Sequence, residues 1–258
     1  MPTLHPPSSP RLAVILAILV ILPPYVSRGF DILRIPVMNA FILTHSIRQD
    51  ASSLFPIANL LQIGALITVL FFRAKPARVF SIYLFIAYAA SGILQNISVS
   101  DEHGFAISTS TMLLTLLVAY SWLKELLSPK NDFSHKYSFG RAAVLIPLAV
   151  VAVWQPVNPS SLLPELDLRS VLSSGSSLTF CMTTIVALSV LLMYYPYANM
   201  ETLRTTSAVG LLIGIGNLWL EFVYLPGFFW VGVLHIPLVV LSALGLYLSS
   251  THVGQAAA

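Results

Sequence analysis

Charged side chains are scarce in this sequence. Of its 258 residues only 9% are Asp, Glu, Lys or Arg, whereas 57% are hydrophobic, and the mean hydropathy is +0.84. A soluble domain usually carries roughly a quarter charged residues, which cover its exterior. The shortage excludes an ordinary soluble fold, because too few charges are present to cover one. Lipid is therefore expected to cover most of the surface.

Cysteine and metal-binding patterns are nearly absent. Cys181 is the single cysteine and lies in an apolar run, where we expect it to pack between helices. One cysteine excludes a disulfide framework and a cysteine metal site. The six histidines include no pair at the spacing of a helical zinc site. We expect no metal and no other cofactor.

Several membrane functions are excluded by what is missing. The last lysine, Lys136, precedes the final apolar runs, so no late lysine can hold retinal. The sequence has no Walker loop, no dinucleotide-binding glycine motif and no arginine-rich voltage-sensing helix. The serine-rich run 173–177 is typical of a loop and helix cap, not of a nucleophile turn. The net charge of +3 is typical of loop orientation in a membrane protein, so nucleic acid is not an expected partner.

Apolar runs long enough to cross a bilayer recur along the chain. A spanning helix needs about 20 such residues, because each adds about 1.5 Å against a hydrocarbon core of about 30 Å. We expect spans at Leu54–Phe72, Val79–Val99, Phe105–Leu123, Ala142–Val157, Ser177–Tyr195, Thr206–Leu225 and Phe228–Ser249. The fold class is therefore all-α, a polytopic transmembrane helical bundle of seven or eight spans in one multi-pass membrane domain, 1–258.

The N-terminal region decides between seven and eight spans. Leu12–Val26 is short and fits either a first span or a signal-like segment over residues 1–26, and the poor cleavage pattern near Ser27 favours a retained span. Residues 27–53 mix apolar and charged side chains and are expected to form an interfacial segment. Residues 54–249 then form a seven-helix bundle.

Positive charges gather in alternate links between the expected spans. They are Arg73, Lys75, Arg78, Lys124, Lys130, Lys136, Arg141 and Arg204. The opposing loops instead carry the acids Asp101, Glu102, Glu165 and Asp167. Because cytoplasmic loops are enriched in Lys and Arg, we expect the cationic links and the C-terminus to lie in the cytoplasm. The two halves show no repeat, so the inverted-repeat signature of many transporters is missing.

Few polar side chains fall inside the expected spans, and each is costly enough there to be a ligand-binding candidate. They are Asn59, Gln62, Gln95, Asn96, Gln155, Asn217, Glu221 and His235. In the expected orientation all eight lie in the outer half of the membrane, which suggests a polar cavity that opens outward, ringed by Tyr224, Trp230 and Trp154. The alternative is that the amides only bond neighbouring helices, Glu221 only reaches the interface and His235 is a hydrogen-bonded neutral histidine.

A row of small residues marks one face of a late span. Gly210, Gly214 and Gly216, with Ser207, resemble the Gly-xxx-Gly pattern that lets helices approach closely. We interpret this face as helix packing and not as a ligand site.

One stretch resembles a known family. Trp219-Leu-Glu221-Phe222-Val-Tyr224 is similar to the Trp-Glu-Phe-x-Tyr stretch of small fungal membrane terpene cyclases. Here the spacing differs by one residue and the stretch falls late in the chain instead of early. The resemblance implies a membrane-embedded enzyme that modifies lipids or isoprenoids, with Glu221 as the acid and His235 as its helper.

The leading functional hypothesis is non-enzymatic: a small-molecule carrier or a receptor-like sensor with an outward-facing polar cavity. Its expected partners are membrane lipids and a small-molecule ligand. The enzymatic alternative is the terpene-cyclase-like activity with Glu221 as general acid, which burial would favour by raising the carboxyl pKa. An assembly or scaffold subunit is a third class.

Overall fold

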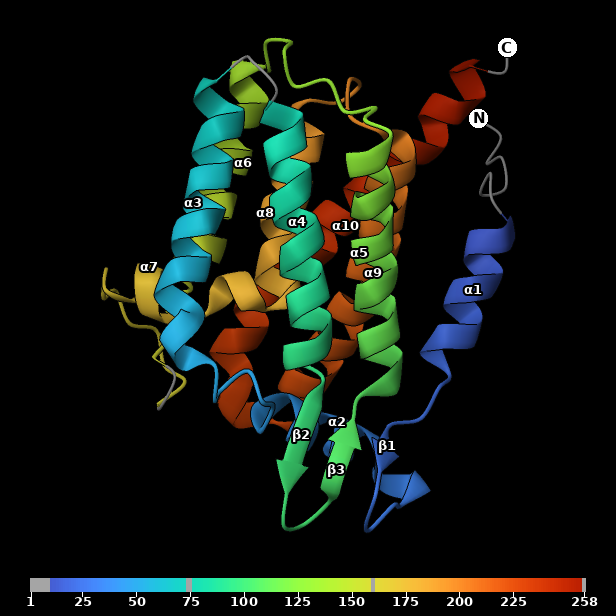
Figure 1. The fold of residues 1–258 in the computed structure, drawn as a ribbon, viewed down its shortest axis with the longest axis vertical. Coiled ribbons are helices and arrows are strands. Elements are labelled where there is room, and N and C mark those ends of the chain that lie inside the picture. The colour runs from blue at the N-terminus through green and yellow to red at the C-terminus, as the bar shows by residue number, and fades with distance from the viewer. Residues whose placement is uncertain (1–9, 73–75, 159–160, 257–258) are drawn as a thin grey trace.

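The chain folds into a helical bundle with a small sheet at one end (Figure 1). The computed structural model describes residues 10–72, 76–158 and 161–256. Among these residues, five helical segments are long and apolar enough to cross a membrane. They are Ser52–Phe71, Pro76–Leu94, Thr109–Leu127, Met200–Tyr224 and Pro226–Thr251. The helices that form them are α3 (Phe55–Phe71), α4 (Pro76–Leu94), α5 (Thr109–Leu127), α9 (Met200–Trp219) and most of α10 (Phe229–Ala256).

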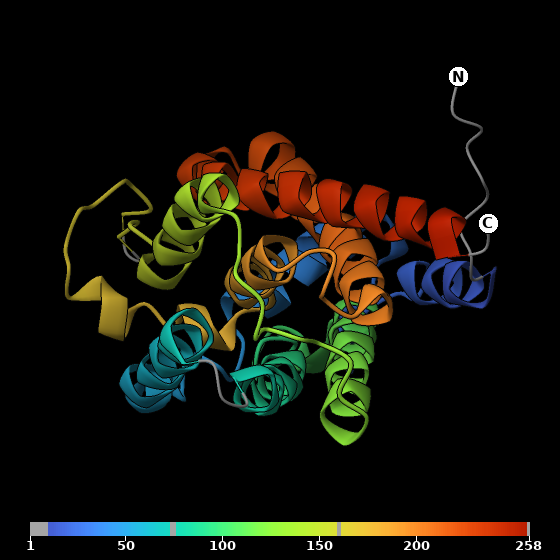
Figure 2. The ribbon, with the colours of Figure 1, turned by 90° about the horizontal axis from the view of Figure 1, so that it is seen from above.

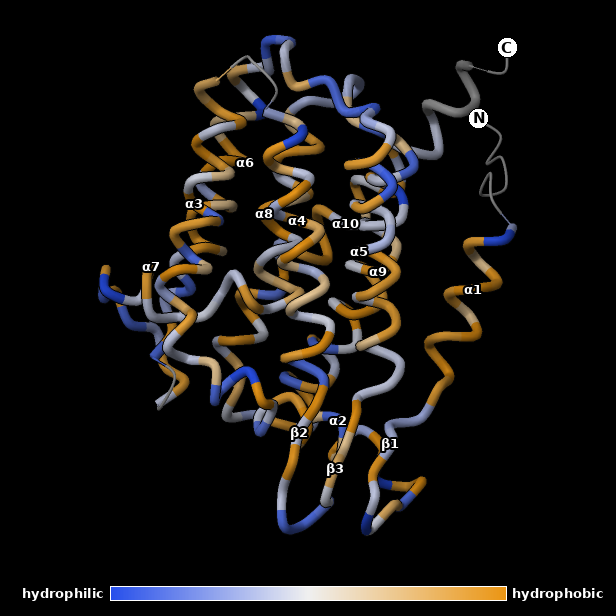
Figure 3. The backbone as a smooth tube through the Cα atoms, in the orientation of Figure 1, coloured by the Kyte–Doolittle hydropathy of each residue, from blue (hydrophilic) through white to orange (hydrophobic). Residues whose placement is uncertain are grey.

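Apolar side chains on these helices remain exposed. Ile57, Leu60 and Leu61 on α3 are each more than half exposed, and Val240 on α10 is 57% exposed. Figure 3 shows hydrophobic positions along the length of the helices and hydrophilic ones concentrated toward the two ends. Such a surface is favourable in lipid and costly in water. The chain is therefore a predominantly helical membrane protein of the all-α class, as its composition predicted.

Shorter elements complete the bundle. The other α-helices are α1 (Pro10–Val20), α2 (Ile35–Thr44), α6 (Phe139–Trp154), α7 (Ser170–Ser173) and α8 (Phe180–Met193). Single turns of 3-10 helix occur at η1 (Ile32–Arg34), η2 (Ser52–Leu54), η3 (Ser176–Leu178) and η5 (Pro226–Phe228), and one π-helical turn, η4 (Leu220–Tyr224), follows α9. Helix α1, which overlaps the apolar run Leu12–Val26, is thus only 11 residues long, and α2 gives the expected interfacial segment a helical core.

Helix α8 forms the centre of the bundle. All 14 of its residues are buried, and it contacts α4, α6, α9 and α10. Figure 2 shows it surrounded by the other helices. A helix that is apolar on every face is stable only when neighbours cover every face, and this one has them.

The chain enters α8 through a sharp bend. Residues Ser170–Leu178 meet Phe180–Met193 at 89°, so the two pieces form a broken span or a re-entrant loop, and they are the sixth candidate crossing. Gly175 allows the bend, because its φ is +65° and a Cβ there would lie 2.7 Å from the ring of Phe55. The straight span expected at Ser177–Tyr195 is therefore wrong in its first turn.

A three-stranded sheet replaces the expected ends of two spans. β2 (Ile97–Ser100) and β3 (Gly104–Ile107) form an antiparallel hairpin that pairs Ser98 with Ala106, and β1 (Tyr25–Val26) pairs with the other edge of β3. The helix expected to continue through Val99 therefore ends earlier, at Leu94. The helix expected to begin at Phe105 begins later, at Thr109. Serines alternating with β-branched residues, and Gly104 at φ +64°, favour a hairpin over helix here.

Close packing joins α9 to α10. A Cβ at Gly210 would lie 2.5 Å from Ser242 Oγ, and one at Gly214 would lie 2.9 Å from Val239, so the packing interpretation of these two glycines is confirmed. A Cβ at Gly245 on α10 would in turn lie 2.2 Å from Ser207 Oγ. Gly216 is different, since a Cβ there would meet nothing within 4 Å. The prediction that Gly216 belongs to the packing face is therefore wrong.

Candidate functional site

Three of the eight candidate residues meet in one buried cluster. Asn217 lies in the last turn of α9, Glu221 lies in the π-helical turn η4, and His235 lies on α10. Cys181, in the first turn of α8, joins them. The cluster therefore lies where three helices meet beside the bend that opens α8.

Glu221 and His235 form a buried pair. Glu221 Oε2 lies 2.7 Å from His235 Nδ1, and the two side chains are only 9% and 8% exposed. Burying a carboxylate or an imidazolium alone is costly, and a partner at hydrogen-bonding distance offsets much of that cost. Glu221 therefore bonds a second helix and is largely shielded from the surroundings of the bundle.

The π-helical turn places Glu221 in the cluster. Asn217 and Glu221 are four residues apart, and the wider turn Leu220–Tyr224 comes directly after the regular helix. π-Helical turns are rare and are found frequently at functional sites. Glu221 is the only buried residue of this turn.

Cys181 is a functional candidate that the sequence did not reveal. Asn217 Nδ2 donates a hydrogen bond to Cys181 Sγ at 3.1 Å. The thiol is 3% exposed. No local spacing signals this arrangement, because residues 181, 217 and 235 come together only when three helices pack. Among the described residues, no group of three His, Cys, Asp or Glu side chains is arranged to hold a metal ion.

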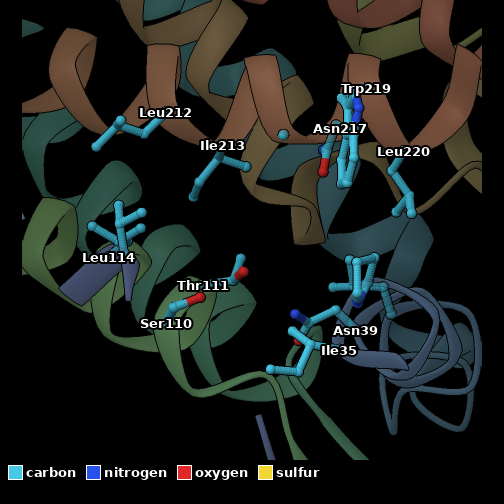
Figure 4. A pocket seen from close by; sticks show the side chains of 14 residues that line it. Ile35, Asn39, Ser110, Thr111, Leu114, Leu212, Ile213, Asn217, Trp219 and Leu220 are labelled. Atoms are coloured by element: carbon cyan, nitrogen blue, oxygen red, sulfur yellow. The ribbon is translucent and has the colours of Figure 1, made fainter. Parts of the chain in front are cut away.

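A cavity of about 340 Å³ adjoins the cluster. Side chains from α9 and η4 face those from α5 and α2 across it, as Figure 4 shows. The lining is mainly apolar, with four polar side chains: Asn39, Ser110, Thr111 and Asn217. Asn217 thus belongs to both features, since it lines the cavity and bonds the sulfur of Cys181.

The expected aromatic ring around the cavity is wrong. The cavity is lined by Trp219, against which Tyr224 packs edge-on at 4.6 Å between ring centroids. Trp230 packs against Phe229 instead, and Trp154 Nε1 donates to the Asp167 carbonyl. Of the eight polar candidates, Asn217 alone lines this cavity.

Asn59 holds the bend before α8. Its amide nitrogen donates to the Val171 carbonyl at 2.9 Å, and its oxygen accepts from the backbone nitrogen of Ser177 at 3.2 Å and from Ser177 Oγ at 2.5 Å. Ser176 Oγ also donates to this oxygen. With every bonding position occupied by the protein, Asn59 acts as a structural residue here, as the packing alternative proposed.

Arg48 also contacts this bend. Its guanidinium lies over the Phe55 ring at 5.6 Å and donates to the Gly175 carbonyl at 3.5 Å. Burial lowers the pKa of Arg48 from its ordinary value.

Gln62 lies one turn from Asn59 on α3 and is fully buried. Neither its amide nitrogen nor its amide oxygen has a hydrogen-bond partner among the described residues. The two amides share a helix face, yet their environments differ completely.

The remaining amides lie apart from the cavity. Gln95 Oε1 accepts from the Phe180 backbone nitrogen at 2.9 Å, so it caps α8 one residue before Cys181. Asn96 Nδ2 donates to the Gly92 carbonyl at 3.1 Å. Gln155 ends α6 with a φ of 49°. Of these three, only Gln95 supports the cluster, by fixing the start of the helix that carries the sulfur.

A second buried carboxylate, also missed in the sequence, lies at the other end of the bundle. Glu125 is 1% exposed and accepts from the backbone nitrogens of Lys130 and Asn131 at 2.8 and 2.7 Å and from Asn199 Nδ2 at 2.6 Å. These bonds tie the loop after α5 to the N-cap of α9, which is a structural role.

The cluster of Cys181, Asn217, Glu221 and His235, together with the cavity beside it, is the candidate site. No family model matches the chain, and no curated protein and no solved structure is similar to it.

Proposed function

We infer that this chain is a membrane protein that binds a small amphipathic molecule in the cavity between α2, α5 and α9, as a carrier or a receptor-like sensor. The observation that carries this proposal is the position of Asn217, which lines the cavity and contacts the buried polar cluster. A ligand in the cavity can thereby change the hydrogen bond between Asn217 and Cys181.

The cavity has the properties of a ligand site. Small-molecule pockets measure about 300–1,000 Å³ and combine apolar walls with a few polar groups that orient the ligand. A volume of about 340 Å³ with four polar side chains in an apolar wall fits this description. The ligand is expected to have an apolar body and one hydrogen-bonding end.

Filling the cavity should abolish binding. Gly216 lines the cavity and a Cβ there would meet nothing within 4 Å, so Gly216→Leu adds volume at the cavity wall without a clash at Cβ. We expect at least a tenfold loss of affinity, measured as ligand-induced thermal stabilisation with a panel of fatty acids, isoprenoid alcohols and sterols.

Gly64→Leu is the matched control, because Gly64 on α3 also has nothing within 4 Å and lies outside the cavity. It should bind like the unmodified protein. A Gly216→Leu variant that is stabilised as strongly as the control would contradict the proposed site.

The proposal includes seven or eight membrane crossings and a cytoplasmic C-terminus. Supporting this, the C-terminal ends of α3, α5 and α8 lie at one end of the bundle, and the hairpin lies at the other (Figure 1). Arg78, Lys124, Lys130, Lys136, Arg141 and Arg204 belong to the first end, whereas Arg73 and Lys75 lie outside the described residues. Moving one positive charge to the bilayer centre costs about 2.5–3.5 kcal/mol, so short cationic links are retained in the cytoplasm.

Cysteine labelling tests this orientation. Ala77 and Ser100 lie at opposite ends of α4 and its continuation into β2, so they should fall on opposite sides of the membrane. In a Cys181→Ser background, we expect Ser100→Cys in intact cells to react with an impermeant maleimide and Ala77→Cys to react only after permeabilisation. The reverse pattern would overturn the orientation.

A second candidate function, a membrane-embedded lipid- or isoprenoid-modifying enzyme, is favoured by the Glu221–His235 contact. A carboxyl group bonded to an imidazole beside an apolar cavity can transfer a proton to a bound substrate. Under this alternative, Glu221→Gln would retain ligand binding and eliminate turnover, whereas a carrier or sensor produces no new compound.

A further inference from the structure

A second, smaller cavity lies between the C-terminal end of α5, with the loop that follows it, and the N-terminal end of α9. Its volume is about 150 Å³, below the range of about 300–1,000 Å³ that is usual for a whole small-molecule ligand. Every residue of its lining carries a polar side chain, although 57% of the chain is hydrophobic. The lining residues are Ser121, Lys124, Ser128, Lys130, Asn199, Glu201 and Thr202.

One hydroxyl group of this lining is buried and unpaired. Ser121 is 7% exposed, and its Oγ has no hydrogen-bond partner among the described residues. Burying a hydroxyl group without a partner is costly, and most such groups in folded proteins are paired. Because Ser121 lines the cavity, a ligand bound there can supply the missing partner.

The other groups around the cavity favour an anion. Lys124 and Lys130 contribute two ammonium groups. Asn199 is the N-cap of α9, a helix of 20 residues, and Thr202 lies in its first turn. Backbone N–H groups of a first helical turn lack intrahelical partners, and the helix dipole there attracts negative charge. Lysines, a hydroxyl group and a helix N-terminus are together a typical environment for a phosphate group.

The buried Glu125 carboxylate holds two parts of this lining in place. It accepts from the backbone nitrogen of Lys130 at 2.8 Å and from Asn199 Nδ2 at 2.6 Å. A third donor, the backbone nitrogen of Asn131, lies 2.7 Å away. The loop after α5 and the start of α9 are thereby fixed around the cavity before any ligand binds.

Glu201 is the anion that contacts the two lysines in this structure. It bonds Lys124 Nζ through Oε1, and its Oε2 lies 3.9 Å from Lys130 Nζ. The three side chains are between 49% and 60% exposed, and ion pairs this exposed contribute little to stability. A phosphate monoester carries more charge than a carboxylate and offers more acceptor oxygens, so it can replace Glu201 on the lysines.

We propose that this cavity binds the phosphate of an anionic lipid headgroup. It lies at the ends of two candidate spans, Thr109–Leu127 and Met200–Tyr224, which is the level at which headgroups lie. Tyr120 and Leu127 on α5 are 58% and 76% exposed, so the acyl chains of such a lipid have an apolar surface beside the cavity. The proposed orientation places this end at the cytoplasmic leaflet, where basic pockets between helices bind anionic headgroups. The site is separate from the cavity between α2, α5 and α9 and goes beyond the function proposed for that cavity.

The test measures dissociation constants for the purified full chain in a phosphate-free, non-ionic detergent. The probes are dioctanoyl phosphatidic acid, dioctanoylglycerol, which has the same chains without a phosphate, and inorganic phosphate, which lacks the chains. We expect phosphatidic acid to bind at least tenfold more tightly than either of the others. Equally tight binding of inorganic phosphate would assign the site to free phosphate and reject the lipid. Equally tight binding of dioctanoylglycerol would overturn the phosphate site.

Single substitutions locate the binding. Lys124→Gln should weaken phosphatidic acid binding about tenfold, and Ser121→Ala should weaken it about threefold, because a charged hydrogen bond is worth more than a neutral one. Glu201→Gln should strengthen binding, since the competing carboxylate is removed, and weaker binding would contradict the proposed exchange. Lys136→Gln is the matched control, because Lys136 is an exposed lysine of the loop after α5 that does not line the cavity.

The control should bind phosphatidic acid like the unmodified chain. Equal losses from Lys136→Gln and Lys124→Gln would show only general attraction between charges and would overturn the site. Thermal unfolding without lipid checks that each variant folds. The comparison of the three probes uses the unmodified chain, so it decides the proposal even if a variant fails to fold.

Discussion

Replacing His235 with alanine should lower the free energy of unfolding by about 3–5 kcal/mol, which is the cost of leaving a buried charged partner uncompensated. The reason is the position of Glu221: its side chain is 9% exposed, and its Oε2 lies 2.7 Å from the imidazole that would be lost. Glu221→Ala should cost a similar amount. Equilibrium unfolding with SDS in mixed micelles measures both values.

The chain supplies its own control for this prediction. Glu102 and His103 form a second Glu–His contact at 3.7 Å, but the Glu102 side chain is 69% exposed. Exposed pairs contribute about 0–1 kcal/mol, so Glu102→Ala should leave stability nearly unchanged. Equal losses from Glu102→Ala and Glu221→Ala would contradict the role of burial.

A double variant separates the pair from its surroundings. Replacing both members with apolar residues, Glu221→Leu with His235→Phe, leaves no uncompensated charge and should cost less than either alanine variant. The resulting coupling energy in a double-mutant cycle should exceed about 1 kcal/mol. Simple additivity would show that the two side chains do not stabilise each other.

Asn59→Leu should destabilise the protein by about 2–4 kcal/mol, whereas Gln62→Leu should be neutral or stabilising. Removing the Asn59 amide leaves the Val171 carbonyl and the Ser177 hydroxyl buried without their partner, and each such group costs about 1–3 kcal/mol. Gln62 has no bond to lose, so an apolar side chain of similar size removes an unpaired amide from the core.

Two measurements check the contrast. Thermal unfolding in detergent gives the order of stability, and limited trypsin digestion at the exposed Arg169 reports release of the bend before α8. Digestion should accelerate in Asn59→Leu and remain unchanged in Gln62→Leu. The contrast is wrong if both variants lose stability equally.

The sequence by itself determined that lipid surrounds most of this protein and which polar residues lie within its apolar helices. Hydropathy is a property of each residue and its surroundings, so long apolar runs predicted the membrane helices without knowledge of their partners. The cost of polar groups in lipid likewise identified Asn217, Glu221 and His235 in advance. The spacing of Asn217 and Glu221 placed both on one helix face, and the structure keeps them in one cluster.

The tertiary structure alone decided what these residues contact. Asn59 and Gln62 have similar side chains on the same face of α3, but only Asn59 meets the bent segment before α8. Cys181, which its apolar sequence surroundings identify as a packing residue, accepts a hydrogen bond from Asn217 because α8 begins inside the bundle. The physical reason is that hydrogen-bond partners depend on the rotation and packing of whole helices, and neither is determined by the residues of one helix alone.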